Sequence, residues 1–536
     1  MLRNVLADYI SGVQEREFDL PLLALLPTLG FYDIHFTHGQ VEFGKDIIAK
    51  RLEDGSVYQY SFQSKAGDIT QAEWRNNIMG QMLESILTGL SHPNFDKSLP
   101  HQSILVVTGR LIGNAALGLQ ELNKTIQEKY EKRPIIVWDR EELISDLETF
   151  GLEGVYRTTA SDFVSYGDFF ILYGKCLQGN ITERDIERHS RRWLDESVPL
   201  SKRLLAATIE AESIAQKCTQ QGLYYEAIHS YLCAIRAILF YLQDEKIEIK
   251  RAELVDIYNQ AELKHYIACK GYLNNIRSSW ISSDKNLARL SAGPTGMFTY
   301  LVHCARIIET AGTLYFLEPD ENIRQDITTF IEEFISHEPG SFHIPCDRYA
   351  VSLVLPILAL CKSNRSPFAQ EILRNTTVWL CNRVEDGLGI ASIEASPLAE
   401  VTKLIGYPFA FIPQDLSRGS LLATVLCDLA AFLGYAQFYN DVVNDLMASG
   451  ISPEYWQTPD TKSLFQIDGS EVIMYPNIEP KDNIGRYEDY DYAEHIKHEP
   501  RSYHISQFTN PFSLMNIMLL LRDRYFPTTW LVLIRS

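Results

Sequence analysis

Three residues in the first part of the chain have the types and spacing of a site that cleaves phosphodiester bonds. Asp46, Gln63 and Lys65 bring a carboxylate, an amide and an ammonium group into one short stretch. Carboxylate and amide oxygens are hard ligands that can hold Mg²⁺. The metal would polarise a phosphate and activate a water, and the lysine would stabilise charge developing on phosphorus. We therefore predict that all three are catalytic, with Asp46 and Gln63 as metal ligands.

A predicted β-hairpin brings these side chains together. Asp54-Gly55 is a strong two-residue turn signal between two strand-like runs. If these two residues form the turn, the numbers of paired residues sum to 109, so Asp46 faces Gln63. Gln63 and Lys65 then project from one face. The aromatic side chains of the same strand, Tyr58, Tyr60 and Phe62, project from the other face, toward the core.

The elements around the hairpin follow a mixed α/β pattern. Strand-like runs cover 41–52, 57–63, 103–108 and 134–138, and helical runs cover 20–29, 115–129 and 141–150. A further helix is expected after Thr70 and Glu73, which have the spacing of a capping box. This alternation predicts a sheet with helices packed on it.

The hairpin resembles the PD-(D/E)XK nuclease superfamily, in the Q-x-K variant found in Mrr-like restriction endonucleases. Gly44-x-Asp46 followed by Gln63-Ser64-Lys65 carries the resemblance, which extends over about residues 15–148. It implies a restriction-endonuclease-like α/β domain at 1–155, a mixed sheet flanked by helices, with DNA as substrate and Mg²⁺ as cofactor, Mn²⁺ being a substitute. By this resemblance Asp46 matches the metal-binding aspartate, Gln63 the second ligand and Lys65 the catalytic lysine.

A glutamine in place of the usual acid leaves the predicted site short of one negative charge. Glu42, two positions before Gly44, is our candidate for the additional acid, both as a catalytic residue and as a metal ligand. Glu17 and Asp19 are weaker rivals, in the region where many members of the family carry a helical glutamate. The carbonyl of Ser64 is a further candidate ligand.

Charge limits how the chain can bind DNA. The formal net charge is −20, and residues 1–150 hold 14 lysines and arginines against 21 aspartates and glutamates. This excludes a positively coated protein that grips nucleic acid nonspecifically. DNA contact is expected through a local patch, the metal or a partner, and Arg75 and Arg110 are the candidates for phosphate contacts.

Helical periodicity dominates beyond about residue 165. We expect an α-helical domain at 165–320 and an α-helical C-terminal domain at 321–536, with an irregular insertion around 463–506. The segment 220–228 resembles the turn of a tetratricopeptide repeat, and a plain helical bundle is the alternative. At 536 residues and 46% hydrophobic, the chain should form two or more domains with proper cores.

Cysteines and apolar runs indicate a cytoplasmic protein without a membrane partner. The nine cysteines are scattered singly and include no C-x-x-C pair, which fits reduced, buried thiols. The N-terminus lacks the features of a signal peptide. The run 421–438 is about as long as a membrane span but contains Asp428, so we expect a buried core helix.

The leading expectation is a Mg²⁺-dependent DNA endonuclease acting in prokaryotic anti-phage defence. The helical region would then sense, form homo-oligomers or dock a partner protein. Two alternatives stay open: an inactive nuclease fold that serves as a DNA-binding or scaffold subunit, and a DNA-repair nuclease. The intact set of Asp46, Gln63 and Lys65 favours an active enzyme.

Overall fold

The chain is described by a computed structural model. It covers residues 2–14, 16–37, 45–89, 92–152, 162–243, 249–290, 296–391, 400–401, 403–404, 419–434, 436–453, 456–457, 465, 473–474 and 512–522. The chain divides into two compact units, Met1–Lys264 and His265–Ser536, and each is described by itself. The division into three domains stays a prediction, and the insertion around 463–506 lies almost wholly outside the described residues.

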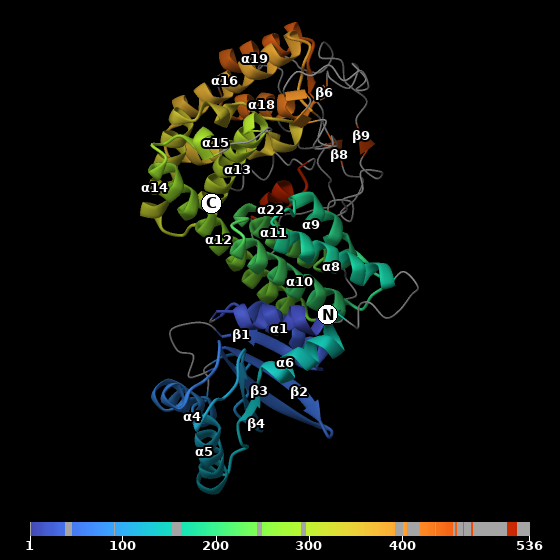
Figure 1. Ribbon diagram of the computed structural model, residues 1–536, viewed down its shortest axis with the longest axis vertical. Coiled ribbons are helices and arrows are strands. Elements are labelled where there is room, and N and C mark those ends of the chain that lie inside the picture. Colours follow the sequence, from blue (N-terminus) through green and yellow to red (C-terminus); the bar gives the residue numbers. More distant parts are fainter. Residues whose placement is uncertain are drawn as a thin grey trace. The chain divides into compact units, whose positions relative to one another are not determined.

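The first unit contains the predicted mixed sheet, with strand order β1-β2-β3-β4-β5 (Figure 1). Its strands are β1 (Tyr32–Phe36), β2 (Ile47–Glu53), β3 (Ser56–Lys65), β4 (His101–Val107) and β5 (Ile136–Trp138). β1, β2 and β3 pair antiparallel, whereas β4 and β5 run parallel to β3. The change from antiparallel to parallel pairing occurs at β3, the strand that carries Gln63 and Lys65.

The β2–β3 hairpin has the predicted register. Glu53 pairs with Ser56 and Ile47 with Phe62, so the residue numbers of each pair sum to 109. Asp54 and Gly55 have φ values of 47° and 79°, both in the left-handed region that a tight hairpin turn requires. Aspartate tolerates this region better than most residues, and glycine adopts it without strain.

The sequence pattern missed β1 and misplaced the start of β2. β2 begins at Ile47, whereas the predicted run began at 41; residues 41–44 lie outside the described part of the chain. The pairing of β1 with β2 is irregular between Tyr32 and His35, and Asp33 has a φ of 54°. This irregularity breaks the alternation by which a strand is recognised in sequence.

Both faces of the hairpin are buried, whereas the sequence pattern placed only the aromatic face in the core. On one face Phe31 packs edge-on against Tyr60 and Phe62, with ring centroids 5.0 and 5.4 Å apart. On the other face Gln59 is 0% exposed and Ser61 is 1% exposed. The polar residues on that face are therefore covered by helices and not exposed to solvent.

Helices of the first unit cover the sheet and continue into a helical layer (Figure 1). They are α1 (Leu2–Gly12), α2 (Asp19–Thr28), α3 (Gln71–Glu73), the π-helical turn η1 (Trp74–Ile78), α4 (Met79–Leu87), α5 (Ala115–Tyr130), α6 (Arg140–Asp146), the π-helical turn η2 (Leu147–Leu152), α8 (Asp162–Gln178), α9 (Glu183–Ser190), the 3₁₀ turn η3 (Arg191–Leu194), α10 (Leu200–Gln220), α11 (Tyr224–Tyr241) and residues 251–264 of α12 (Arg251–Ser282). The Thr70 hydroxyl accepts from the Glu73 N–H at 3.3 Å, as its cap position predicted.

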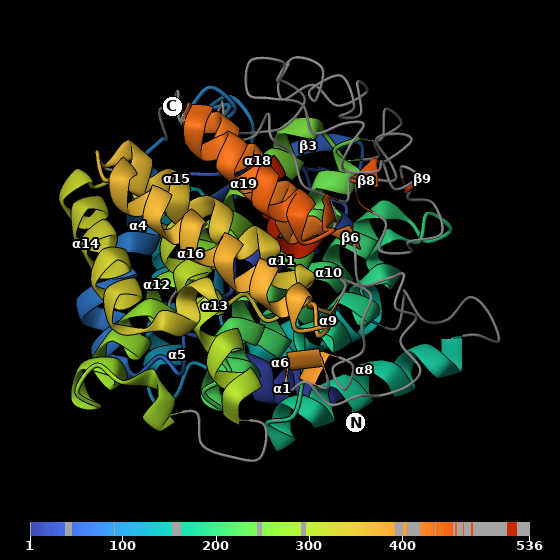
Figure 2. The ribbon, with the colours of Figure 1, turned by 90° about the horizontal axis from the view of Figure 1, so that it is seen from above.

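The second unit is mostly helical, as predicted (Figure 2). It contains η4 (Leu287–Leu290), α13 (Gly296–Leu317), α14 (Glu321–His337), η5 (Pro339–Phe342), η6 (Asp347–Leu353), α15 (Val354–Lys362), α16 (Ser366–Glu385), α18 (Leu421–Phe432), α19 (Ala436–Ala448), α22 (Ser513–Leu520) and the short strands β6 (Gly419–Ser420), β7 (Ser452–Pro453), β8 (Trp456–Gln457) and β9 (Ile473–Met474). The run 421–438 is mostly buried but divides between α18 and α19. Within the described ranges no helix combines the length and apolarity that crossing a bilayer requires.

Candidate active site

The β2–β3 hairpin holds Asp46 beside Gln63. The Asp46 N–H donates to the Phe62 carbonyl at 2.8 Å, which extends the ladder one residue beyond β2. Asp46 Oδ2 accepts from Gln63 Nε2 at 2.9 Å and from the Ser64 N–H at 2.7 Å. The sequence predicted this pairing, and the structure adds the direct bond between the two side chains.

The other end of the Gln63 amide is buried without a partner. Gln63 is 6% exposed, and its Oε1 makes no hydrogen bond. A buried acceptor left unpaired costs free energy, and in native proteins such atoms usually meet water or an ion. Because Nε2 is bonded to Asp46, Oε1 is the amide atom left to bind a cation.

Asp19 supplies a second carboxylate to this site from α2. It is the first residue of the helix and 2% exposed, and its Oδ1 has no hydrogen-bond partner. Burial, followed by the charge of Asp46, raises the pKa of Asp19 to about 7, although Lys264, Arg16 and Ser64 act in the opposite direction. The two carboxylates are thus close enough to compete for ionisation.

These residues fit a hard divalent cation. Asp46 offers a carboxylate, and Gln63 Oε1 and Asp19 Oδ1 are buried oxygens with nothing to bind. Oxygen donors of this kind suit Mg²⁺ or Mn²⁺. Over the described ranges, however, no cluster of three or more carboxylate, imidazole or thiolate groups forms a metal site. Glu42, the predicted additional acid, lies outside those ranges.

Of the two rival acids, Glu17 and Asp19, the structure brings Asp19 close to Asp46. Glu17 Oε2 instead accepts from the Gln14 N–H at 2.6 Å. A sequence signal for Asp19 existed: α2 reads DLPLLALLPT, an apolar helix without a polar face. An acid that begins such a helix must either cap it or be buried, and here it is buried.

The other predicted residues occupy different surroundings. Lys65 ends β3, opposite Val107 of β4, and is partly buried. Arg110 donates to Glu141 at 2.6 Å on the surface, so its charge already has a partner. Arg75 belongs to η1 and lines a groove of about 520 Å³ between η1 and α5. Contacts of Arg75 and Arg110 with DNA stay a prediction.

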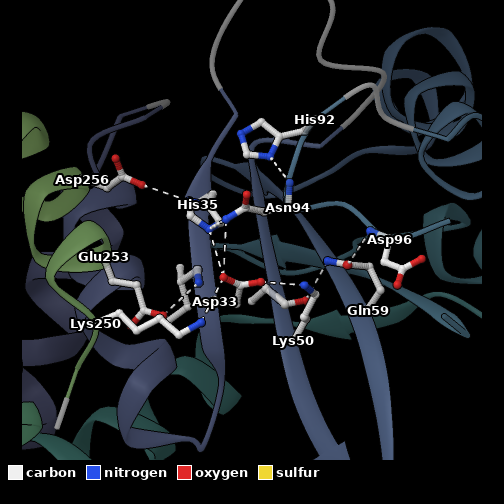
Figure 3. Close-up of polar contacts among 12 residues, drawn as sticks. Asp33, His35, Lys50, Gln59, His92, Asn94, Asp96, Lys250, Glu253 and Asp256 are labelled. Carbon is white, nitrogen blue, oxygen red and sulfur yellow. Dashed lines mark hydrogen bonds and ion pairs between the residues drawn. The ribbon is translucent and has the colours of Figure 1, made fainter. Parts of the chain in front are cut away.

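A charged cluster further along β2 joins that strand to β1 and α12 (Figure 3). Asp33 Oδ2 lies 2.6 Å from Lys50 Nζ of β2, and its Oδ1 lies 3.2 Å from Lys250 Nζ and 3.3 Å from His35 Nε2. His35 Nδ1 lies 3.6 Å from Asp256 Oδ2 in α12. The cluster therefore ties β1 and β2 to the start of α12.

The same cluster has two shifted pKa values. Burial acts to raise the pKa of Asp33, but hydrogen bonds from Lys50, Lys250 and His35 outweigh it and hold that pKa well below its usual range. The pairing with Asp256, helped by Asp33, raises the pKa of His35. Both shifts favour the charged forms, as expected of ion pairs that hold two elements together.

Comparison with known proteins gives no relative for this chain: no family model, curated protein or solved structure matches it.

Proposed function

We propose that the first unit carries a divalent-metal-dependent DNA endonuclease site built from Asp46, Gln63, Lys65 and Asp19. The observation that supports it best is the pair of unpartnered buried oxygens, Gln63 Oε1 and Asp19 Oδ1, beside the Asp46 carboxylate. The resemblance of Gly44-x-Asp46 and Gln63-Ser64-Lys65 to PD-(D/E)XK nucleases of the Mrr type supports the same function. The proposed fold is accordingly restriction-endonuclease-like.

The protein groups have distinct roles in this proposal. Asp46 and Gln63 hold one another through the Nε2–Oδ2 bond, so the carboxylate and the amide oxygen are presented in a fixed geometry. The raised pKa of Asp19 favours its protonated form up to near-neutral pH, and binding of a metal cation would displace that proton. Lys65, on the face of β3 shared with Gln63, orients the attacking water and stabilises the negative charge that develops on the phosphate.

The bound Mg²⁺ or Mn²⁺ would supply Lewis-acid polarisation of the phosphate and a lower pKa for the attacking water. Asp46, Gln63 and Asp19 would hold it, with Ser64 and Glu42 as further candidates. Without Glu42, the negative charge of this set comes from the two carboxylates of Asp46 and Asp19. Metal affinity should therefore rise with pH as Asp19 loses its proton.

The proposal extends to the role of the whole chain. By its resemblance to restriction-type nucleases, we place the enzyme in prokaryotic anti-phage defence, with the helical remainder sensing, oligomerising or docking a partner protein. Phage plating on bacteria that express the wild type or Lys65→Ala tests this role. Survival of the same strains after DNA damage tests the repair alternative.

Cleavage of supercoiled plasmid in Mg²⁺ or Mn²⁺ tests the activity itself. Lys65→Ala should lower the rate by about 10²–10³-fold, the effect of removing one group that stabilises developing charge. Asp46→Ala should leave background cleavage only. Lys132→Ala, which removes an exposed lysine from the same domain, is the matched control and should cleave like the wild type.

Two results would contradict the proposal. Wild-type cleavage that persists in both Asp46→Ala and Lys65→Ala would place the activity elsewhere or in a contaminant. If the wild type cleaves no DNA with or without added metal, and Mg²⁺ has no effect on its thermal unfolding, the inactive scaffold would be favoured instead.

A further inference from the structure

The groove between η1 and α5 plays no part in the proposed metal site. It has a volume of about 520 Å³ and begins at Gln71, the first residue of α3, and at Asn114, just before α5. These helical segments follow β3 and β4, which are parallel neighbours, and a bridge between Ile69 and Leu111 holds the two connections together. The groove therefore begins at the edge of the sheet where β3 ends in Lys65. Ligands of sheets with parallel strands commonly bind outside this edge.

Trp74 forms part of the groove wall, and α5 approaches it closely. Trp74 is 1% exposed, and its Nε1 makes no hydrogen bond. A Cβ added at Gly118 would lie 2.7 Å from that Nε1, so α5 can come this near only because residue 118 is a glycine. Trp74 also begins η1, and π-helical turns of this kind are frequent at functional sites. The backbone thus sets part of the shape of the groove.

The lining offers free polar groups of both kinds, donors and acceptors. Within the described ranges, no hydrogen bond or ion pair engages the side chains of Gln71, Arg75, Asn114 and Glu121. Arg75 and Glu121 are the charged members of the described lining, and their charges cancel. A phosphate would meet the like charge of Glu121, and a metal cation that of Arg75. The lining therefore matches a neutral ligand that both donates and accepts hydrogen bonds.

Apolar side chains make up much of the remaining lining. Leu117 of α5 is 56% exposed, and Met79 and Leu122 also line the groove. A nucleobase combines apolar ring faces with an edge that carries donors and acceptors. Arg75 is suited to donate to ring acceptors, and Glu121 to accept from an amino group of the base.

We propose that this groove binds one unpaired base of a DNA strand whose backbone lies at the β2–β3 hairpin. The inference rests on the proposed function, which places the DNA backbone beside Lys65, at the edge of the sheet where the groove begins. An unpaired base fits best, because a base that is already free of its partner costs least to bring into a pocket.

The test compares binding of the full chain to two short fluorescein-labelled duplexes. One duplex carries a single bulged base, made in four versions, and the other carries an abasic residue at the same place. Binding is measured by fluorescence anisotropy in Ca²⁺, an oxygen-binding cation other than the metals proposed for cleavage, and a gel confirms intact DNA. The wild type should bind at least one version about 5–100-fold more tightly than the abasic duplex, the value of one bound base.

Two groove variants with matched controls test the assignment. Glu121→Gln removes a charged acceptor and should weaken binding of the preferred duplex about tenfold or more, with the abasic duplex unaffected. Glu128→Gln, at an exposed position of α5 outside the lining, is its control. Leu117→Trp should fill the groove and remove the preference for a base. Ala116→Trp, at the exposed neighbouring position outside the lining, should keep it.

Several results would overturn the base site. Equal binding of all duplexes by the wild type would do so, as would a preference that persists in both Glu121→Gln and Leu117→Trp. If Leu117→Trp fails to fold, Glu121→Gln decides alone. Tighter binding of both kinds of duplex by Glu121→Gln, but not by Glu128→Gln, would indicate a phosphate in the groove instead. Binding of a free deoxynucleoside, without preference for a bulged base, would overturn the assignment to DNA.

Plasmid cleavage separates failure of this site from failure of the proposed function. Metal-dependent cleavage together with equal binding of all duplexes would refute the groove and leave the nuclease standing. A preference for the bulged base without cleavage in Mg²⁺ or Mn²⁺ would support the groove and count against the nuclease.

Discussion

Asp19 should give the metal-free protein an unusual dependence of stability on pH. Its pKa is raised from 3.8 to about 7 in the folded chain. Between about pH 4 and 7 the folded chain holds a proton that the unfolded chain has released, so the free energy of unfolding falls as pH rises. In urea unfolding with EDTA, Asp19→Asn should flatten this fall, whereas Glu17→Gln should keep it. A fall of equal slope in Asp19→Asn would show that another group causes it.

Because Gln63 is neutral, it places no second negative charge beside Asp46 when no metal is bound. Gln63→Glu replaces the hydrogen bond to Asp46 with a like charge, and should destabilise the metal-free chain by about 1–3 kcal/mol. Mg²⁺ should restore its melting temperature, since in the proposed site the new carboxylate would be a metal ligand. Gln59→Glu places the same charge on the same buried face and should not recover with Mg²⁺. Equal recovery of both variants would argue against a cation at Gln63.

At the scale of elements, the cluster of Asp33, His35 and Lys50 should decide how firmly β1 and β2 are held to α12 (Figure 3). Asp33→Asn keeps a residue that tolerates its positive φ but removes the charge. We expect a loss of about 1–2 kcal/mol in the free energy of unfolding, measured with denaturant. Asp33→Ala should lose more, because alanine also strains the backbone; an equal loss would exclude a role for this φ.

The cluster also has its own pH window. The lowered pKa of Asp33 contributes stability that is present above 3.8, its ordinary pKa, and is lost as pH falls. The raised pKa of His35 contributes stability that is complete below 6.5 and is lost as pH rises. The difference in stability between wild type and the double variant Asp33→Asn/His35→Gln should therefore peak between about pH 4 and 6.5. A difference that is flat over pH would contradict the ion-pair interpretation.

At the scale of the whole molecule, a buried ion pair fastens the C-terminal segment into the second unit. Arg522, just after α22, donates to both carboxylate oxygens of Glu309 in α13, at 2.8 and 2.9 Å, and both residues are at most 5% exposed at their side chains. Glu309→Ala leaves a buried guanidinium and should cost about 3–5 kcal/mol. The double variant Glu309→Leu/Arg522→Met removes both charges and should cost much less. Equal losses would show that packing, rather than charge, matters there.

The hairpin was predictable because its information is local. Asp54-Gly55 has few conformations open to it, and a turn of known length sets every pair of the two strands, including Asp46 with Gln63. The irregular β1 and the π-helical turn η1 were not predictable, because neither has the periodicity by which strands and helices are recognised.

The sequence by itself determined the mixed sheet and the hairpin register, including the pairing of Asp46 with Gln63, since strand alternation and turn chemistry act between near neighbours. Only the tertiary structure decided that Asp19 is buried close to Asp46, because its place depends on how α2 packs and not on its neighbours in the sequence. Tertiary packing likewise buried charged residues such as Arg203 and Arg236 between the helices of the first unit. A side chain's type is written in the sequence, but its solvent exposure and its distant partners arise only when the elements pack.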